Sequence, residues 1–268
     1  MTSWAIAQPP QQSLRVGLTP VFLDDRIGVL RRWASHLEAT LGQSIRWVQF
    51  SSYSQIVDAL RGAQLDFAWI CGYPYVRERS HLALVSVPLW RGKPLYQSYL
   101  IADRASSIRT IDDLRGRVFA YSDPLSNSGF LYPNFRLRSR GFDPGRMFRR
   151  SFFTYSHRHV VDAVAQGLAE AGAVDGYIWE ALAELAPAAV GQTRILEKSP
   201  DFGFPPFVAP RSTPPGLVAR FAAALERMPA SELGRAVLAE LRLDGFTSVS
   251  PGLFDGIAAM ARDGSGPS

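Results

Sequence analysis

The stretch VFAYSDPLSNSGFLYP, residues 118–133, decides the fold of this chain. It begins with VFAY, an apolar run that has the length and composition of a buried strand. Asp123 and Pro124 end this strand, and the small polar residues after them are typical of a loop that leads into a helix. A strand, a polar turn and a helix in this order form the repeating unit of an α/β protein.

The turn of this unit, residues 126–129 (the SNSG loop), has the composition of an anion site. Ser126, Asn127 and Ser128 offer hydroxyls, an amide and backbone N–H groups at a helix N-terminus, where the helix dipole favours negative charge. Gly129 has no side chain, so a ligand can approach the backbone closely. The same residues would also make an ordinary helix cap, and this segment alone does not separate the two interpretations.

The same unit recurs along the rest of the chain. Apolar strand-like runs lie at residues 14–20, 44–50 and 95–102, with amphipathic helical patterns between them. The stretch LDFAWICGYPYV, residues 65–76, carries a buried strand into a Gly-Tyr-Pro turn, and open α/β sheets bind ligands at such strand ends. The sequence therefore predicts an α/β fold built on parallel sheets.

Two places in the chain indicate crossings between lobes. The alternating strand at 95–102 leads out of the first half, and Gly-Phe-Pro-Pro at 203–206 cannot extend a regular element. We therefore expect lobe I to comprise residues 13–100 and 196–268, and lobe II to comprise residues 101–195.

Composition describes a globular protein with a substantial core. The 268 residues are 47% hydrophobic and 12% aromatic, which excludes the disordered and fibrous classes. The net charge is +5, and arginines gather at residues 136–150. Because no nucleic-acid recognition motif accompanies them, we interpret them as a solvated basic surface that attracts anions, and we expect no nucleic-acid partner.

No catalytic or metal-binding motif stands out. The only cysteine, Cys71, cannot form an internal disulfide, and neither a Cys/His metal spacing nor a Walker-type phosphate loop is present. Ser126, His157 and Asp175 could be combined into a hydrolase triad, but the G-x-S-x-G nucleophile elbow is missing. We expect no enzyme activity and no cofactor, and we keep a Ser/His hydrolase as a remote alternative.

The N-terminal segment has one feature of an exported protein. Ala5-Ile6-Ala7 before Gln8 matches the small-x-small end of a secretory cleavage site, but the basic and apolar regions of a signal peptide are missing in front of it. We expect a periplasmic protein whose signal peptide is absent from this sequence, and chance in a polar tail is the alternative.

Four motifs in order carry a resemblance to a known family. They are LRVGLTP at residue 14, LDFAWICGYPYV at 65, DPLSNSGFLYP at 123 and SHRHVVDAVAQGLAEAGAVD at 156. With them the chain resembles the phosphonate-binding family of periplasmic substrate-binding proteins, which includes phosphonate, phosphite and phosphate receptors of ABC importers. The resemblance implies a type II periplasmic-binding fold, in which two α/β lobes joined by two crossings enclose a ligand.

The resemblance also implies roles for particular residues. The SNSG loop falls on the family's oxyanion loop, which is Ser-Thr-Ser-Gly there, so Asn127 replaces one hydroxyl. His157 falls on a histidine that donates to the oxyanion, and Tyr96 on an aromatic donor at the hinge. Pro133 lies in the first turns of the expected helix, so either the helix kinks there or its regular part starts later.

Four further residues keep two interpretations each. Cys71 is either a small buried hydrophobe or a thiol ligand for arsenite, which some relatives of the family sense. Asp175 either bonds backbone donors or accepts a hydrogen bond from a protonated oxyanion or a ligand amine. Tyr73 and Phe22 either line the cleft or pack in the core.

These observations predict a monomeric periplasmic receptor for a small oxyanion, namely phosphate, phosphite or a phosphonate. Its membrane partner would be an ABC permease or a sensor histidine kinase. An arsenite sensor that uses Cys71 in two-component signalling is the alternative.

Overall fold

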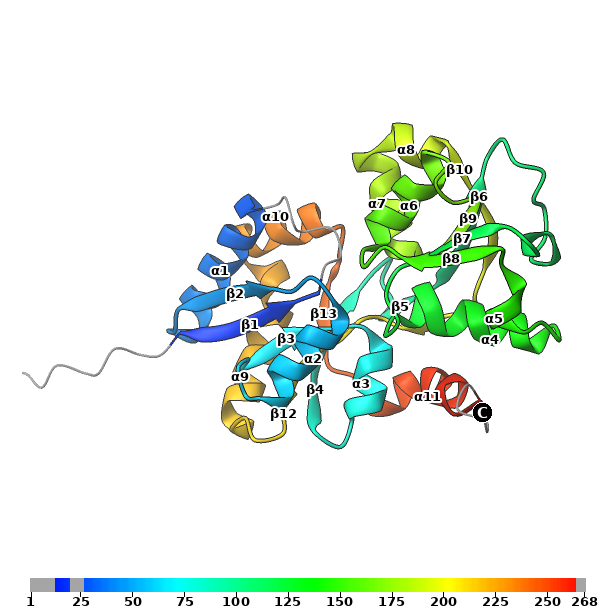
Figure 1. Ribbon diagram of the computed structural model, residues 1–268. Helices are drawn as coiled ribbons and strands as arrows, with labels where there is room; N and C mark the ends of the chain where they lie inside the picture. Colours follow the sequence, from blue (N-terminus) through cyan, green and yellow to red (C-terminus); the bar gives the residue numbers. More distant parts are fainter. Residues whose placement is uncertain (1–12, 20–26, 264–268) are drawn as a thin grey trace, which may run out of the picture.

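The structure is a computed structural model and describes residues 13–19 and 27–263 (Figure 1). Phe22 and the Ala5-Ile6-Ala7 segment lie outside the described residues. Two α/β halves lie side by side, one holding the chain's beginning and the other its middle (Figure 1). We call them lobe I and lobe II.

Lobe I is built on a six-stranded sheet with the order β13-β4-β12-β3-β1-β2. The three strands that begin the chain are parallel, and the other three are antiparallel to their neighbours. Its strands are β1 (Leu14–Leu18), β2 (Ile45–Gln49), β3 (Phe67–Trp69), β4 (Leu82–Leu89), β12 (Phe207–Pro210) and β13 (Gly245–Thr247). Its helices are α1 (Ile27–Leu41), α2 (Tyr53–Arg61), α3 (Gly72–Glu78), α9 (Pro215–Glu226), the short η3 (Met228–Ala230) and α10 (Glu232–Leu241).

Lobe II is built on a five-stranded sheet with the order β10-β6-β9-β7-β8. Its strands are β6 (Ser98–Asp103), β7 (Val118–Tyr121), β8 (Arg150–Phe153), β9 (Ala171–Asp175) and β10 (Thr193–Lys198). Its helices and helical turns are η1 (Asp112–Leu114), η2 (Asn127–Leu131), α4 (Tyr132–Ser139), α5 (Pro144–Met147), α6 (His157–Ala165), α7 (Gly176–Leu185) and α8 (Pro187–Gly191).

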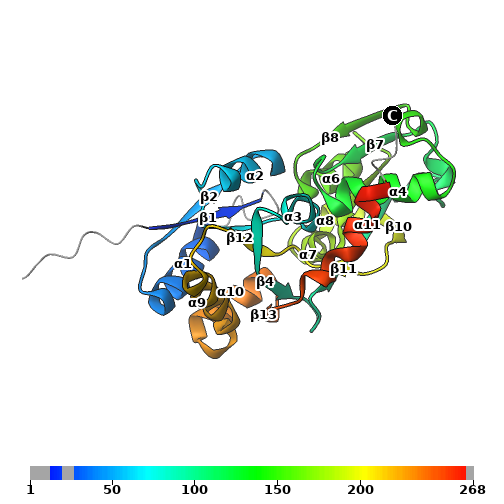
Figure 2. The same cartoon turned by 90° about the horizontal axis from the view of Figure 1, so that it is seen from below.

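Two crossing strands join the lobes and pair with each other. Tyr96 of β5 (Leu95–Tyr96) lies opposite Phe202 of β11 (Phe202–Gly203) in an antiparallel ladder. The lobe boundaries that we propose after residues 100 and 195 fall inside β6 and β10, a few residues from this ladder. The chain then ends with η4 (Pro251–Phe254) and α11 (Asp255–Asp263), and α11 packs on α3 and reaches α4 and η2 of the other lobe (Figure 2).

An aromatic cluster forms the core of lobe I and reaches the space between the lobes. The fully buried ring of Trp33 lies 5.0 Å from that of Trp47 and 5.8 Å from those of Trp69 and Phe207, measured between ring centroids. Burying such rings stabilises a lobe strongly, and edge-to-face contacts fix their orientation. Trp69 is therefore held rigidly at the end of β3.

The stretch at residues 118–133 folds as strand, turn and helix. Ser126 caps the turn by accepting the Gly129 N–H at 2.9 Å, and η2 is a single π-helical turn. The regular helix α4 starts only at Tyr132, directly after the π turn, so Pro133 lies in its first turn, and the Gly129 carbonyl four residues before it accepts the Ser122 N–H instead. A Cβ at position 129 would lie 1.8 Å from the Ser122 hydroxyl, so the close approach that requires this glycine is to Ser122.

Two local predictions are wrong. The Gly-Tyr-Pro segment is the first turn of α3 rather than a loop, because Pro74 fits the start of a helix, where no N–H bond is needed. The stretch SIRTIDDLRG before residue 118, whose pattern predicts a helix, contains only the 3₁₀ turn η1, since Asp113 uses its carboxylate to bind the N–H groups of Arg109 and Thr110 instead of continuing a helix.

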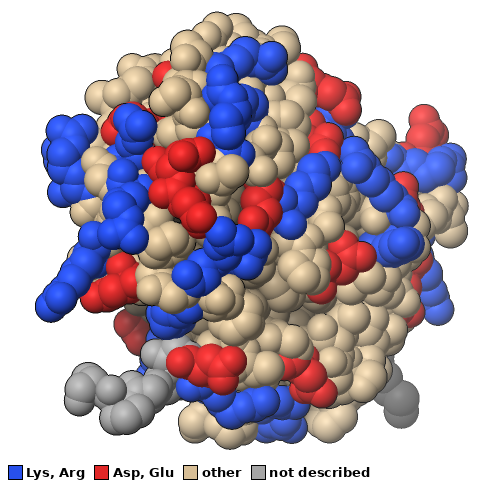
Figure 3. Space-filling view, turned by 90° about the vertical axis from the view of Figure 1, so that its right-hand side faces the viewer, with Lys and Arg blue, Asp and Glu red and all other residues tan. Residues whose placement is uncertain are grey.

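The surface of lobe II carries mixed charge. On the face in Figure 3, basic and acidic side chains are interspersed. Within the basic segment 136–150, Arg136 pairs with Glu197, Arg140 with Asp112 and Arg149 with Glu170. Among the described residues no helix is both long and apolar enough to cross a membrane.

Candidate functional site

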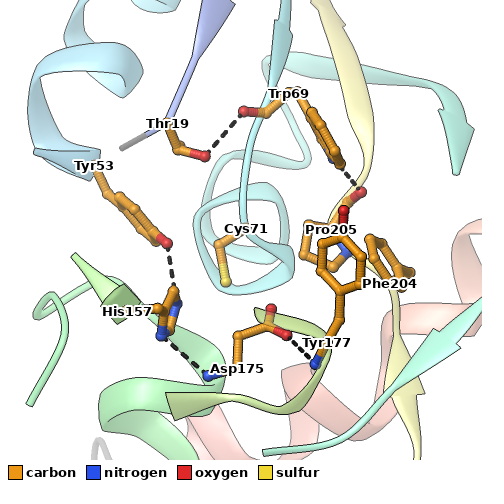
Figure 4. A pocket seen from close by; sticks show the side chains of 9 residues that line it. All are labelled: Thr19, Tyr53, Trp69, Cys71, His157, Asp175, Tyr177, Phe204 and Pro205. Carbon is orange, nitrogen blue, oxygen red and sulfur yellow. Dashed lines mark hydrogen bonds between the residues drawn. The ribbon is translucent and has the colours of Figure 1, made fainter. Parts of the chain in front are cut away.

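A small cavity lies between the two lobes (Figure 4). Its volume is only about 20 Å³, so the side chains that line it already lie close to one another. Lobe I, lobe II and the returning crossing all contribute to its wall, which is lined by Thr19, Tyr53, Trp69, Cys71, His157, Asp175, Tyr177, Phe204 and Pro205.

The beginnings of four helices meet at this cavity. Tyr53 is the first residue of α2, Cys71 precedes α3, His157 is the first residue of α6, and Asp175 precedes α7. Each helix start carries a partial positive charge and N–H groups that no helical carbonyl satisfies. None of the described residues that line the cavity is lysine or arginine. Among the described residues, the partial positive charges that face the cavity are therefore those of the helix starts.

His157 is neutral, and one hydrogen bond determines its tautomer. Its Nδ1 accepts the backbone N–H of Asp175 at 3.0 Å, so in the neutral ring the proton is on Nε2. Burial lowers the pKa of His157 to about 3 because a charged imidazolium would lose its hydration. The Nε2 atom lies 3.3 Å from the Tyr53 hydroxyl and is a hydrogen-bond donor on the cavity side.

Asp175 has one carboxylate oxygen engaged and the other turned toward the cavity (Figure 4). Its Oδ1 accepts the N–H groups of Tyr177 at 2.8 Å and Ile178 at 3.4 Å, which caps α7. Burial raises the pKa of Asp175 to about 7, although these two N–H bonds oppose the shift. Near neutral pH the group can therefore either accept or donate a hydrogen bond at the cavity wall.

Cys71 turns its sulfur into the same space. The Sγ atom accepts the backbone N–H of Asn127 across the lobes at 3.3 Å. Burial raises the pKa of the Cys71 thiol to about 11, so the thiol stays protonated at neutral pH. The sulfur therefore separates the cavity from the N-terminal end of η2.

The SNSG loop lies behind Cys71 and is fully buried, and it does not line the cavity in this arrangement. The Asn127 side-chain N–H donates to the Tyr96 hydroxyl at 3.0 Å, and the Cys71 thiol and the Ser128 hydroxyl lie beside the same hydroxyl. Within the described part of the chain, Asn127 Oδ1 and Ser128 Oγ make no hydrogen bond of good geometry, although both are buried. Such buried polar atoms are costly unless a ligand or solvent satisfies them.

The structure thus brings Cys71, His157 and Asp175 together at one cavity, with the SNSG loop and Tyr96 in the layer behind them. Tyr73 lies half-buried on α3 under the Arg77 guanidinium and does not line the cavity.

The geometry does not assemble a hydrolase triad. Asp175 meets His157 through its backbone N–H instead of its carboxylate, and the Ser126 hydroxyl accepts the Gly129 N–H. A nucleophilic serine needs the histidine within hydrogen-bonding reach and a carboxylate on the other ring nitrogen.

The sequence analysis missed several residues of the cavity wall, and Tyr53 is the most polar contact among them. It is almost fully buried, its hydroxyl lies beside His157, and its backbone N–H donates to Asp123 of lobe II at 3.0 Å. The available signal was its position directly after Ser51-Ser52, at the polar end of the second strand and the start of a helix. Thr19 and Trp69 also line the cavity from strand ends of the same sheet.

Two α/β lobes with two paired crossings and a cavity between them define a type II periplasmic binding protein. Residues 16–253 match the family described as ABC transporter, phosphonate, periplasmic substrate-binding protein. The chain belongs to this family.

Individual relatives agree with this assignment. The phosphate-import protein PhnD of Mycolicibacterium smegmatis is 29% identical over 178 residues, which are 61% of this chain and 55% of that protein. The chain therefore spans just over half the length of this curated relative. A binding-protein component of an ABC phosphonate transporter from Pseudomonas aeruginosa has a TM-score of 0.87 at 21% identity, over 94% of this chain and 86% of that one.

A second solved structure carries a ligand. The Prochlorococcus marinus protein in complex with methylphosphonate has a TM-score of 0.83 at 19% identity, over 95% of this chain and 98% of that one. At these identities the two structural matches show the fold.

Proposed function

We propose that this protein binds a small phosphorus oxyanion between its lobes and serves as the periplasmic substrate-binding component of an ABC importer. The observation that carries the proposal is the convergence of four helix N-termini on one buried cavity. Backbone N–H groups and the helix dipole together favour an anion at such a place. The family membership and the relatives that import phosphate or bind phosphonates support the same ligand class.

The donors and acceptors around the cavity suit a protonated oxyanion. His157 Nε2–H and the Tyr53 hydroxyl can donate to ligand oxygens, whereas the free oxygen of Asp175 can accept a proton from a ligand O–H. A phosphonate or phosphite monoanion carries both kinds of group. Trp69 and Phe204 form an apolar part of the wall, which suits hydrogen or a short alkyl group on phosphorus.

A ligand that contacts both lobes would also change the conformation of the protein. Tyr53 comes from lobe I and His157 from lobe II, so a ligand that bonds to both gains its full affinity only when the lobes meet. Binding would therefore shift the population toward the closed form.

A thermal-shift panel tests this ligand class. Phosphate, phosphite and methylphosphonate are added separately, with sulfate as the fully deprotonated comparison. A ligand that binds only the native state raises the melting temperature, and at a hundredfold excess over Kd it adds about 2.7 kcal/mol. We expect at least one phosphorus oxyanion to stabilise the protein more than sulfate does. No shift with any of the three would contradict the proposal.

Cys71 supports one alternative, an arsenite sensor, because its sulfur lines the cavity. The raised pKa weighs against it, since the buried thiol is not poised as a thiolate. Cys71→Ser separates the two: with a phosphorus ligand the substitution should change the affinity less than about threefold, because it keeps a small acceptor for the Asn127 N–H. Stabilisation by arsenite alone, lost in Cys71→Ser, would favour the sensor.

The membrane partner is the other part of the proposal. An ABC permease would receive the ligand, whereas a histidine kinase would read the closed form. Permease and ATPase genes beside the gene for this chain would argue for import, and a histidine-kinase gene would argue for sensing.

A further inference from the structure

Asp123 is a buried carboxylate between the lobes that does not line the cavity. It follows β7 and precedes the SNSG loop in lobe II. Its Oδ1 accepts the N–H of Leu125 at 2.7 Å, which is a local turn within its own lobe. Its Oδ2 accepts the N–H of Tyr53 at 3.0 Å, and Tyr53 belongs to lobe I.

The Tyr53 N–H needs an acceptor because of its place in α2. It is the first residue of this helix, so no helical carbonyl precedes it as a partner. The helix's own cap, Ser52, accepts the N–H of Gln55 instead, at 3.4 Å. Asp123 therefore completes the cap of α2 from the opposite lobe, and its carboxylate faces the positive end of that helix.

The two ends of Tyr53 connect this contact to the ligand site. Its backbone N–H bonds to Asp123, and its hydroxyl lies 3.3 Å from His157 Nε2. Both partners belong to lobe II, but only His157 lines the cavity. The Asp123 contact can form whether or not a ligand is present, whereas the hydroxyl is part of the ligand site.

We propose that Asp123 is a positioning residue that closes the cleft by capping α2 across the lobes and so brings the Tyr53 hydroxyl to His157. Without ligand, the contact raises the closed fraction of the protein. Apparent affinity scales with the fraction of the binding-competent form, so losing the contact weakens binding although no ligand contact is removed. The affinity part rests on the proposed function, whereas the closure part does not.

Asp123→Asn is the matched test. The amide can keep the local bond to Leu125 through its oxygen, but it turns an NH₂ group toward the Tyr53 N–H, so two donors face each other. The control is Asp143→Asn in the same lobe, because Asp143 also accepts a local N–H, that of Gly145 at 2.9 Å, and caps the short helix α5 on the exposed surface.

Small-angle scattering without ligand is measured first. We expect a larger radius of gyration for Asp123→Asn than for wild type and Asp143→Asn, which should agree with each other. Calorimetric titration with methylphosphonate follows, and we expect Kd to rise about tenfold for Asp123→Asn and to stay constant for Asp143→Asn, since one hydrogen bond to a charged group is lost.

An unchanged radius of gyration in ligand-free Asp123→Asn overturns the proposal. If the radius increases but wild type binds no phosphorus oxyanion, the closure role stands and the proposed function fails. Circular dichroism checks that the variant folds, and Asp123→Ser provides a second test because its hydroxyl can keep the turn to Leu125 but is too short to reach Tyr53.

Discussion

The two walls of the cavity are built in different ways. The lobe II wall presents His157 and Asp175, which one backbone hydrogen bond holds in a fixed relation. The lobe I wall presents Tyr53 and Cys71, and each of them makes at least one hydrogen bond to lobe II. Lobe II therefore holds a preorganised half-site, whereas the lobe I half is completed only by closure. We expect substitutions in the lobe II wall of the cavity to affect ligand contact and those in the lobe I wall to affect closure as well.

The largest effect is expected from His157→Ala. Losing a hydrogen bond to a charged ligand removes about 1.5–3 kcal/mol, so Kd should rise on the order of ten- to a hundredfold in calorimetric titration with methylphosphonate. His159→Ala is the control, because His159 lies on the same helix α6 but is exposed. Equal affinities of the two variants would mean that the ligand binds elsewhere. The difference that we propose between the two cavity walls would then not hold.

A smaller effect is expected from Tyr53→Phe, which removes only the hydroxyl of lobe I. A typical net hydrogen bond contributes about 0.5–1.5 kcal/mol, which corresponds to a two- to tenfold change in Kd. Tyr73→Phe is matched to it, because Tyr73 is also a tyrosine in the first turn of a lobe I helix but does not line the cavity. If Tyr73→Phe weakened binding as much as Tyr53→Phe, the cavity wall would be wrongly assigned.

A third comparison concerns pH and sharpens the description of the lobe II wall. Asp175 has its pKa raised to about 7, so the folded protein holds a proton that the unfolded chain loses, and this contribution to stability falls as pH rises from about 4 to 7. His157 has its pKa lowered to about 3, so its contribution falls as pH decreases from about 6.5 to 3. The two oppose each other in wild type.

Asp175→Asn should separate these contributions. Asparagine still caps α7, but it cannot ionise. In urea unfolding between pH 4 and 8, the free energy of unfolding of the variant relative to wild type should increase with pH up to about 7. Parallel curves for the two proteins would mean that Asp175 does not titrate in this range.

The sequence predicted the lobe II wall better than the lobe I wall, for a physical reason. Asp175 lies at a strand end directly before a helix, and such a local pattern can be read along the chain, whereas His157 was implied by the resemblance to the family. Tyr53 becomes part of the site only because lobe II meets it, and no local pattern records that contact. The position of the SNSG loop behind Cys71 is likewise a tertiary result.

The fold shows the same division. The α/β alternation was predicted from the periodicity of apolar residues. The sequence analysis did not predict β13, which is only three residues long, or α11, which packs on both lobes. Pro133 illustrates a choice that only the structure makes, since the regular helix starts later instead of kinking.

Lysine and arginine are absent among the described residues of the cavity wall, and this affects how binding would depend on ionic strength. Attraction between exposed point charges is screened by dissolved salt over about 10 Å at 0.1 M, whereas buried groups are screened far less. An anion held by helix ends and neutral hydroxyls therefore keeps its affinity when ionic strength changes. Selection among anions then depends on how readily each gives up its hydration shell and on whether its oxygens match the fixed directions of the donors.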